Sequence, residues 1–124
     1  MIGYVKIRKE DQPGTIYRCA VCGAAITHSN AIIKIYGTDE HSFVNPSGIR
    51  CDFRTFQFCE NVLIHNELFL EHSWFGGYGW RFLNCAVCLQ HLGWKYDAVH
   101  KKTGPASFYG VLVQAVEASQ AEHP

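Results

Sequence analysis

Short runs of alternating apolar and polar residues cover most of the chain and predict a β protein. Successive side chains of a strand point to opposite faces of a sheet, so alternation is typical of a half-buried strand. Residues 11–14, 45–48 and 101–105 hold glycine and proline and are expected to be turns. The runs that read as strands are residues 2–8, 16–18, 31–36, 42–44, 50–58, 62–64, 80–83, 93–97 and 107–116. Residues 115–122 carry helix formers without a cap, so a helical tail is the alternative at the end.

The length and the charge balance narrow the kinds of protein that this sequence specifies. At 124 residues and 14.0 kDa the chain fits one domain, residues 1–124, with a core of modest size. Lysine plus arginine equal aspartate plus glutamate at 11 each, which argues against the basic face of a nucleic-acid-binding protein. The N-terminus lacks the apolar core of a signal peptide, and no apolar stretch approaches the roughly eighteen residues of a membrane span. We therefore expect a cytoplasmic, monomeric protein that contacts neither nucleic acid nor membrane.

Four of the six cysteines stand in two copies of one tetrapeptide, Cys-Ala-Val-Cys. Cys19 and Cys22 form the first copy, and Cys85 and Cys88 form the second. Each copy is able to form a knuckle whose backbone N–H groups face the sulfurs, and four thiolates make a closed, tetrahedral structural zinc site. The alternatives are a redox-active pair, an iron–sulfur cluster, and His91 in place of one cysteine. We expect one zinc ion per chain, which would clamp distant parts of the chain together.

The remaining two cysteines, Cys51 and Cys59, lie in a strand-like run rich in phenylalanine, valine and isoleucine. An unpaired cysteine without a neighbouring base behaves as a small hydrophobic residue. We expect buried, unreactive thiols here, with a nucleophile as the alternative.

The stretch from His72 to Trp80 carries two of the three tryptophans around a Gly-Gly-Tyr-Gly turn. Glycine permits positive φ, so this turn is able to direct both indoles toward one point. Trp94 follows soon after Cys88, and a bound metal would hold it near the same place. Aromatic residues of a small domain often only fill the core, but a glycine turn between two tryptophans suits the lining of a concavity better. We predict that Trp74, Trp80 and Trp94 line one pocket.

Several segments of the chain, taken in order, form a recognisable set. They are the two Cys-x-x-Cys pairs, Val-Asn-Pro-Ser-Gly at 44–48, Glu-His-Ser-Trp-Phe-Gly-Gly-Tyr-Gly-Trp at 71–80, and His-Leu-Gly-Trp-Lys-Tyr at 91–96. In order and spacing the set resembles the thalidomide-binding domain of cereblon, called the CULT domain, and it spans nearly the whole chain. The resemblance is to a free-standing, bacterial-type relative. It implies a mainly β fold, the β-tent of methionine sulfoxide reductase B, Yippee and Mis18, in which two antiparallel sheets meet at an angle and are pinned by a four-cysteine zinc site.

The resemblance also implies a pocket for a cyclic imide. Trp74, Trp80 and Trp94 would be its walls, and Tyr96 would close its floor. The His72 carbonyl would accept the imide N–H, while the ring carbonyls would accept from the Trp74 backbone N–H and the His72 side chain. The other ligand-binding positions are Ser73 and a lip formed by Asn45 and Pro46. The family has proline, alanine and histidine in place of Gly76, Gly79 and Ser47, which implies a softer turn and a broader ligand choice in this chain.

Three classes of function follow from these residues. The first is a binding module for a neutral cyclic imide, such as glutarimide, a uracil-like metabolite, or a peptide whose damaged C-terminus has cyclised to an imide. The second is an aromatic cage for a quaternary ammonium, because indole faces attract cations and Glu71 lies next to the pocket residues. The third, an enzyme of the methionine sulfoxide reductase type, needs a late nucleophilic cysteine, and the last cysteine, Cys88, is assigned to zinc. We therefore expect a binding protein and not an enzyme.

Overall fold

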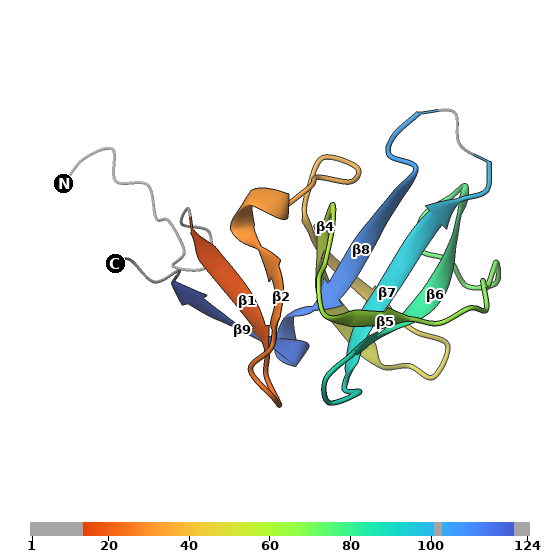
Figure 1. The fold of residues 1–124 in the computed structure, drawn as a ribbon. Helices are drawn as coiled ribbons and strands as arrows, with labels where there is room; N and C mark the ends of the chain where they lie inside the picture. Colours follow the sequence, from red (N-terminus) through yellow and green to blue (C-terminus); the bar gives the residue numbers. More distant parts are fainter. Residues whose placement is uncertain (1–13, 101–102, 121–124) are drawn as a thin grey trace, which may run out of the picture.

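The computed structural model describes residues 14–100 and 103–120, and these fold almost entirely into strands (Figure 1). Two 3-10 helices, η2 (Ser29–Ala31) and η3 (Val113–Ala115), interrupt the strands. The strands are β1 (Thr15–Cys19), β2 (Ala25–His28), β3 (Glu40–Val44), β4 (Arg50–Phe56), β5 (Val62–Ile64), β6 (Tyr78–Cys85), β7 (His91–Ala98), β8 (Ser107–Leu112) and β9 (Val116–Gln120). The mainly β fold expected from the sequence is confirmed.

The strands form two antiparallel sheets, as expected from the resemblance. The small sheet has the order β2-β1-β9, and the large sheet has the order β3-β4-β8-β7-β6-β5. Figure 1 shows the small sheet at the left, inclined to the large sheet, with the chain crossing from β8 to β9 through η3. We call the space between the two sheets the wedge. One face of the large sheet borders the wedge, and the other, outer face points away from the small sheet.

Alternation along β4 distributes side chains to the two faces of the large sheet. Phe56 points into the wedge, where it joins Tyr17 of β1 and Val111 of β8 in a small buried cluster. Phe53 points to the opposite face and belongs to the main core, which also contains Tyr96. Each fully buried aromatic side chain stabilises the fold by roughly 1.5–3 kcal/mol, so both faces of the sheet contribute to stability.

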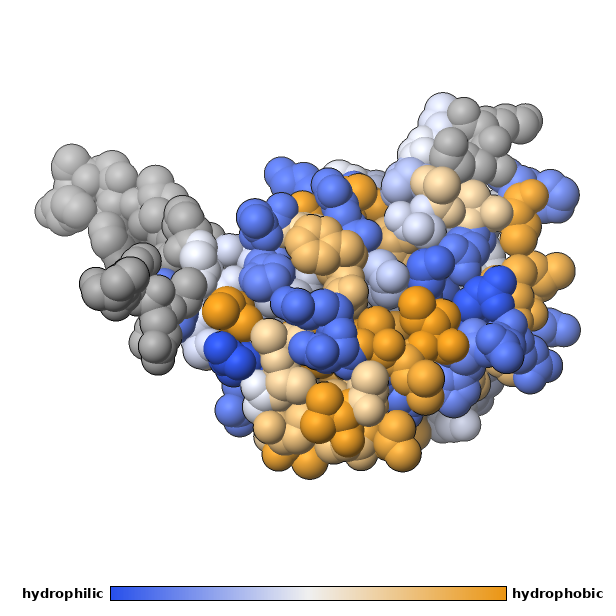
Figure 2. Space-filling view, in the orientation of Figure 1, coloured by the Kyte–Doolittle hydropathy of each residue, from blue (hydrophilic) through white to orange (hydrophobic). Residues whose placement is uncertain are grey.

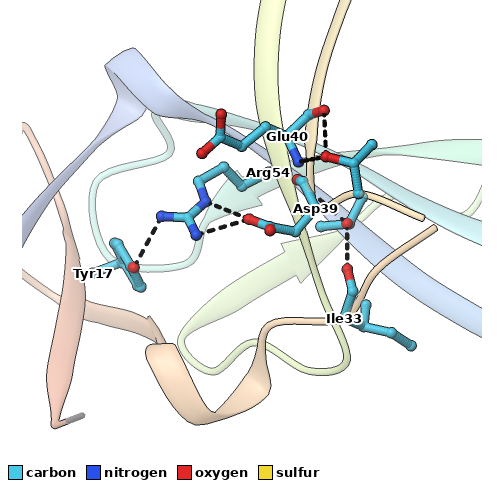
Figure 3. Close-up of polar contacts among 7 residues, drawn as sticks. Tyr17, Ile33, Asp39, Glu40 and Arg54 are labelled. Carbon is cyan, nitrogen blue, oxygen red and sulfur yellow. Dashed lines mark hydrogen bonds and ion pairs between the residues drawn. The ribbon is translucent and has the colours of Figure 1, made fainter. Parts of the chain in front are cut away.

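A buried arginine, Arg54, is paired with a carboxylate beside its own sheet and is hydrogen-bonded to the small sheet (Figure 3). The Arg54 guanidinium on β4 donates to Asp39 Oδ2 from Nε at 2.8 Å and from Nη2 at 2.7 Å. Its Nη1 donates to the Tyr17 hydroxyl on β1 at 3.1 Å. The Arg54 side chain is only 8% exposed, so its charge depends on these partners for compensation.

Two strands expected from the sequence, at 31–36 and at 107–116, differ in the structure, and one strand was missed. Ala31 ends η2, and residues 32–36 form only isolated bridges, because Tyr36 takes φ 55° and Gly37 takes φ 83° and together they turn the chain. The expected strand at 107–116 ends at Leu112, where η3 interrupts it. Residues 116–120, for which a helix was the alternative, form strand β9, because they pair with all five residues of β1. Strand β2 has no counterpart among the predicted runs. The predicted strand at 2–8 and the end of the tail, 121–122, lie outside the described residues.

Candidate functional site

The two Cys-Ala-Val-Cys segments fold into matching turns at the ends of β1 and β6. In the first turn the Gly23 N–H donates to the Cys19 carbonyl at 2.8 Å, and in the second the Leu89 N–H donates to the Cys85 carbonyl at 2.8 Å. The donor residue takes positive φ in both turns, 82° at Gly23 and 71° at Leu89. The repeated tetrapeptide therefore marks a repeated structure, in which each knuckle continues directly from a strand.

The four knuckle thiols come together between the sheets, with their sulfur atoms all within 4.8 Å of one another. The Cys19–Cys88 and Cys22–Cys85 sulfur pairs are each 3.6 Å apart. Zinc–sulfur bonds of about 2.3 Å in a tetrahedron place sulfurs roughly 3.8 Å apart, so the cluster fits a single zinc ion. Burial alone would raise the pKa of Cys85, but the backbone N–H groups of Cys88 and Val87 and the neighbouring thiols hold that pKa down, to about 7.

A zinc ion held by four protein sulfurs is structural, because no coordination position is open for chemistry. His91, the alternative ligand, turns its Nε2 to the Gly93 carbonyl at 3.0 Å and lines a cavity instead. The surface at this end of the molecule is largely hydrophobic, as the lower part of Figure 2 shows. Val21, Val87 and Leu89 are all exposed there.

The second feature, which we call the aromatic cavity, is a hollow of about 280 Å³. Phe53, which points away from the small sheet, contacts the cavity residues Trp74 and Trp94, so the cavity lies on the outer face of the large sheet. Trp94 is 8% exposed and Tyr96 is 2% exposed, which makes them its deep part. The lining residues are Asn45, Pro46, His72, Trp74, Trp80, Phe82, His91, Trp94 and Tyr96.

Stacked rings hold the tryptophan walls in place. Trp74 lies almost parallel to Phe43, with ring centroids 5.1 Å apart, and meets Trp94 edge-on at 5.3 Å. Trp80 stacks on Phe69 at 4.6 Å, and its indole N–H donates to the Glu71 carbonyl at 2.8 Å. Aromatic pairs of this kind contribute about 0.5–1.5 kcal/mol each beyond burial, so the walls are formed before any ligand arrives.

The loop between Glu71 and Phe75 leaves backbone groups available beside the cavity. His72 takes φ 61°, a left-handed conformation that disfavours a non-glycine residue by on the order of 1–3 kcal/mol. Ser73 fixes the loop, since its hydroxyl donates to the Phe75 carbonyl at 3.0 Å and accepts the Phe75 N–H at 3.3 Å. Within the described residues, the His72 carbonyl and the Trp74 N–H take part in no hydrogen bond.

Seven of the eight ligand-binding positions named from the sequence line the aromatic cavity, and Ser73 does not. Sequence reasoning missed two lining residues, Phe82 and His91. Phe82 lies two residues after Trp80 and therefore on the same face of β6, and it pairs across the sheet with Trp94. Strand alternation alone predicts Phe82 on this face, whereas the Cys-x-x-Cys-x-x-His spacing suggests His91 only as a metal ligand.

The wedge between the sheets holds a larger cavity, of about 570 Å³. Several of the charged groups in its wall are already paired, Arg50 with Asp52 at 2.9 Å and Arg54 with Asp39. Its lining includes Tyr17, His41, Phe53 and Phe56 but none of the three tryptophans, which all line the aromatic cavity. The aromatic cavity is therefore the candidate ligand site.

The two remaining thiols are not activated. Burial raises the pKa of Cys51, and burial raises the pKa of Cys59 to about 12. A thiol with a raised pKa carries little thiolate near neutral pH, so neither cysteine is suited to nucleophilic attack.

Comparison with known proteins identifies the family of the chain. Residues 15–124 match the family Yippee-Mis18, described as "Yippee zinc-binding/DNA-binding /Mis18, centromere assembly". The chain belongs to this zinc-binding family. Within it, the chain is a cereblon-type, CULT-like domain.

Cereblon proteins of several animals carry this similarity. Protein cereblon of Danio rerio is 34% identical over 101 residues, which cover 79% of this chain and 23% of that protein. Protein cereblon of Gallus gallus is 35% identical over 75 residues, covering 60% of this chain and 17% of that protein. Protein cereblon of Drosophila melanogaster is 27% identical over 116 residues, covering 86% and 19%. The chain thus spans about a fifth of the length of these relatives.

Among the described residues, no helix is long and apolar enough to cross a membrane.

Proposed function

We propose that the aromatic cavity binds small, uncharged cyclic imides, either as free rings of the glutarimide or uracil type or as the cyclised end of a damaged peptide. One observation carries the proposal. Beside three converging indoles, the loop offers a backbone acceptor at His72 and a backbone donor at Trp74 that no described residue engages. The similarity to cereblon proteins supports the same assignment.

The chemistry of an imide complements this lining. The ring C–H groups are polarised by the flanking carbonyls and suit the electron-rich faces of indoles. The polar edge of the ring presents one N–H between two carbonyls, so it matches an acceptor and a donor placed side by side. Pairing these backbone groups with a ligand removes the penalty of about 1–3 kcal/mol that each would bear if closed off from water without a partner.

A quaternary ammonium ligand is less well matched. Such a cation needs aromatic faces and benefits from a carboxylate that balances its charge. The nine residues that line the aromatic cavity include no carboxylate, and Glu71 contributes its backbone carbonyl to the Trp80 indole instead. The lining therefore favours a neutral ligand over a cation.

Binding without catalysis is the simplest role for this site. The zinc site has four sulfur ligands, and the two other thiols have raised pKa values. Neither feature supplies a nucleophile to the aromatic cavity.

Tryptophan fluorescence titration tests the proposal with three ligands in parallel. Glutarimide has about eight non-hydrogen atoms, and at roughly 1 kcal/mol per atom its affinity is limited to about micromolar. N-methylglutarimide lacks the donor for the His72 carbonyl, so its binding should fall at least tenfold. Tetramethylammonium should not bind.

Two variants complete the test. Trp80→Ala should abolish glutarimide binding while the protein keeps its zinc, whereas Phe58→Ala, at an exposed residue that does not line the aromatic cavity, should bind normally. Equal affinity for glutarimide and its N-methyl derivative would refute the proposal. Binding of tetramethylammonium in preference to both would establish the cation cage instead.

A further inference from the structure

The aromatic cavity is larger than an imide ring requires. A six-membered ring such as benzene fits an engineered apolar cavity of about 150 Å³. The aromatic cavity measures about 280 Å³, so roughly half of it lies beyond a bound ring. That outer part must be bounded by the lining residues that are most exposed.

Phe82 and His91 are the two lining residues that bound the outer part on the β6–β7 side. Phe82 is 37% exposed and meets Trp80 edge-on at 5.1 Å, while His91 is exposed and meets Trp94 edge-on at 5.5 Å. The two outer rings lie 5.7 Å apart. They therefore continue the indole walls outward as a second pair of aromatic surfaces, which we call the outer wall.

The hydrogen bond of His91 fixes the chemical character of this wall. A carbonyl oxygen only accepts, so the contact of His91 Nε2 with the Gly93 carbonyl at 3.0 Å requires that Nε2 carry the proton. In the neutral ring Nδ1 is then an acceptor. Within the described part of the chain, no group donates to His91 Nδ1.

We infer that the outer wall, Phe82 and His91, is a specificity site that selects imides whose ring bears a flat substituent with a hydrogen-bond donor, which pairs with His91 Nδ1. This inference rests on the proposed imide binding and specifies its ligand class. Phe82 supplies the contact surface, and His91 discriminates a substituent with an N–H or O–H from one without. A bare imide ring fills only the inner part of the aromatic cavity.

A matched pair of ligands tests the inference on the unmodified protein. 3-Acetamidoglutarimide and 3-acetoxyglutarimide differ at one position, where the first has an N–H and the second an ester oxygen. Calorimetric titration should show the acetamido compound binding about tenfold more tightly, because the ester oxygen offers no donor and faces a lone pair. Glutarimide itself should bind more weakly than the acetamido compound.

Variants locate the effect. His91→Phe keeps an aromatic ring and removes the acceptor, so the roughly tenfold ratio between the affinities for the acetamido and the acetoxy compound should fall to about one. His65→Phe is the matched control, because the His65 ring lies 6.0 Å from that of Phe82 but does not line the aromatic cavity, and it should retain the full preference. Phe82→Ala should reduce the affinity for both substituted imides by a similar factor and leave their ratio unchanged.

The outcomes separate this inference from the proposed function. If glutarimide binds and N-methylation abolishes binding, but the acetamido and acetoxy compounds bind equally, the outer wall has no selective role. If the preference exists and survives His91→Phe, the discrimination lies elsewhere and the assignment to His91 is wrong. If no imide binds, the proposed function itself fails.

Discussion

Removing the zinc site should unfold the protein rather than only weaken ligand binding, and Cys85→Ser tests this directly. The substitution replaces one of four clustered sulfurs with an oxygen that binds zinc poorly in such a site. The cluster joins the end of β1 to the end of β6, so it connects the small sheet to the strand that carries Trp80. Loss of the metal therefore acts on the fold and on the aromatic cavity together.

The expected magnitude follows from a comparison of the zinc with one of the other contacts between the sheets, the small buried cluster in the wedge. The buried cluster in the wedge has three large side chains, Tyr17, Phe56 and Val111, which contribute roughly 2 kcal/mol each, about 6 kcal/mol together. Structural zinc contributes on the order of 10 kcal/mol in small domains. Whole domains are stable by only about 5–15 kcal/mol, so the chain without zinc should be mostly unfolded.

Elemental analysis, near-ultraviolet circular dichroism and thermal melting give the readout. The unmodified protein should contain one zinc ion per chain, and Cys85→Ser should contain none and lose its near-ultraviolet signal. Cys51→Ser is the matched control, since Cys51 is also buried but lies outside the sulfur cluster, and it should remain folded with its zinc. A Cys85→Ser protein that melts cooperatively without metal would refute the reasoning, as would iron in place of zinc in the unmodified protein.

The candidate site was largely predictable because its determinants are local in sequence. The two Cys-x-x-Cys segments form the same turn, and the glycines around Tyr78 predict a turn between Trp74 and Trp80. Short-range backbone geometry fixes such features, so a sequence displays them directly. The order and spacing of these segments support the resemblance to the CULT domain. That resemblance, in turn, implied the two-sheet fold.

The unpredicted parts depend on partners distant in the sequence. Residues 116–120 have weak helical preference, but pairing with β1 about a hundred residues earlier overrides it. Strand β8 inserts between β4 and β7, and no local signal in residues 107–112 specifies those neighbours. His91 lies at the aromatic cavity because the β6–β7 register places it opposite Asn84. A search for metal-binding motifs does not consider strand register.

Three further tests, each by substitution, concern how the fold supports the site. Asp39→Ala leaves the Arg54 charge buried without its carboxylate, so it should lower the free energy of unfolding, measured by urea titration, by about 3 kcal/mol. An unchanged midpoint of urea unfolding would contradict the stabilising role given to this ion pair. Gly76→Ala should stabilise by about 0.4–1 kcal/mol, because a Cβ there meets nothing within 4 Å. Gly79→Ala should instead destabilise the protein by about 1 kcal/mol, because its Cβ would lie 3.0 Å from the Phe69 carbonyl. Equal melting temperatures for the two glycine variants would show that the structure relieves this contact without loss of stability. The third test concerns His41, whose ring stacks on Phe53 at 5.4 Å and whose Nε2 is buried with no hydrogen-bond partner in the described part of the chain. Burial lowers the pKa of His41 below its usual 6.5, against the opposing effects of the Thr38 backbone and the Asp39 charge. The unfolded chain then binds the proton more readily, so stability is fully present above about pH 6.5 and falls as the pH drops through the lowered pKa. His41→Phe removes this proton uptake and should flatten the acid limb of stability measured between about pH 7 and pH 4.5, and a variant as acid-sensitive as the unmodified protein would show that His41 is not the group responsible.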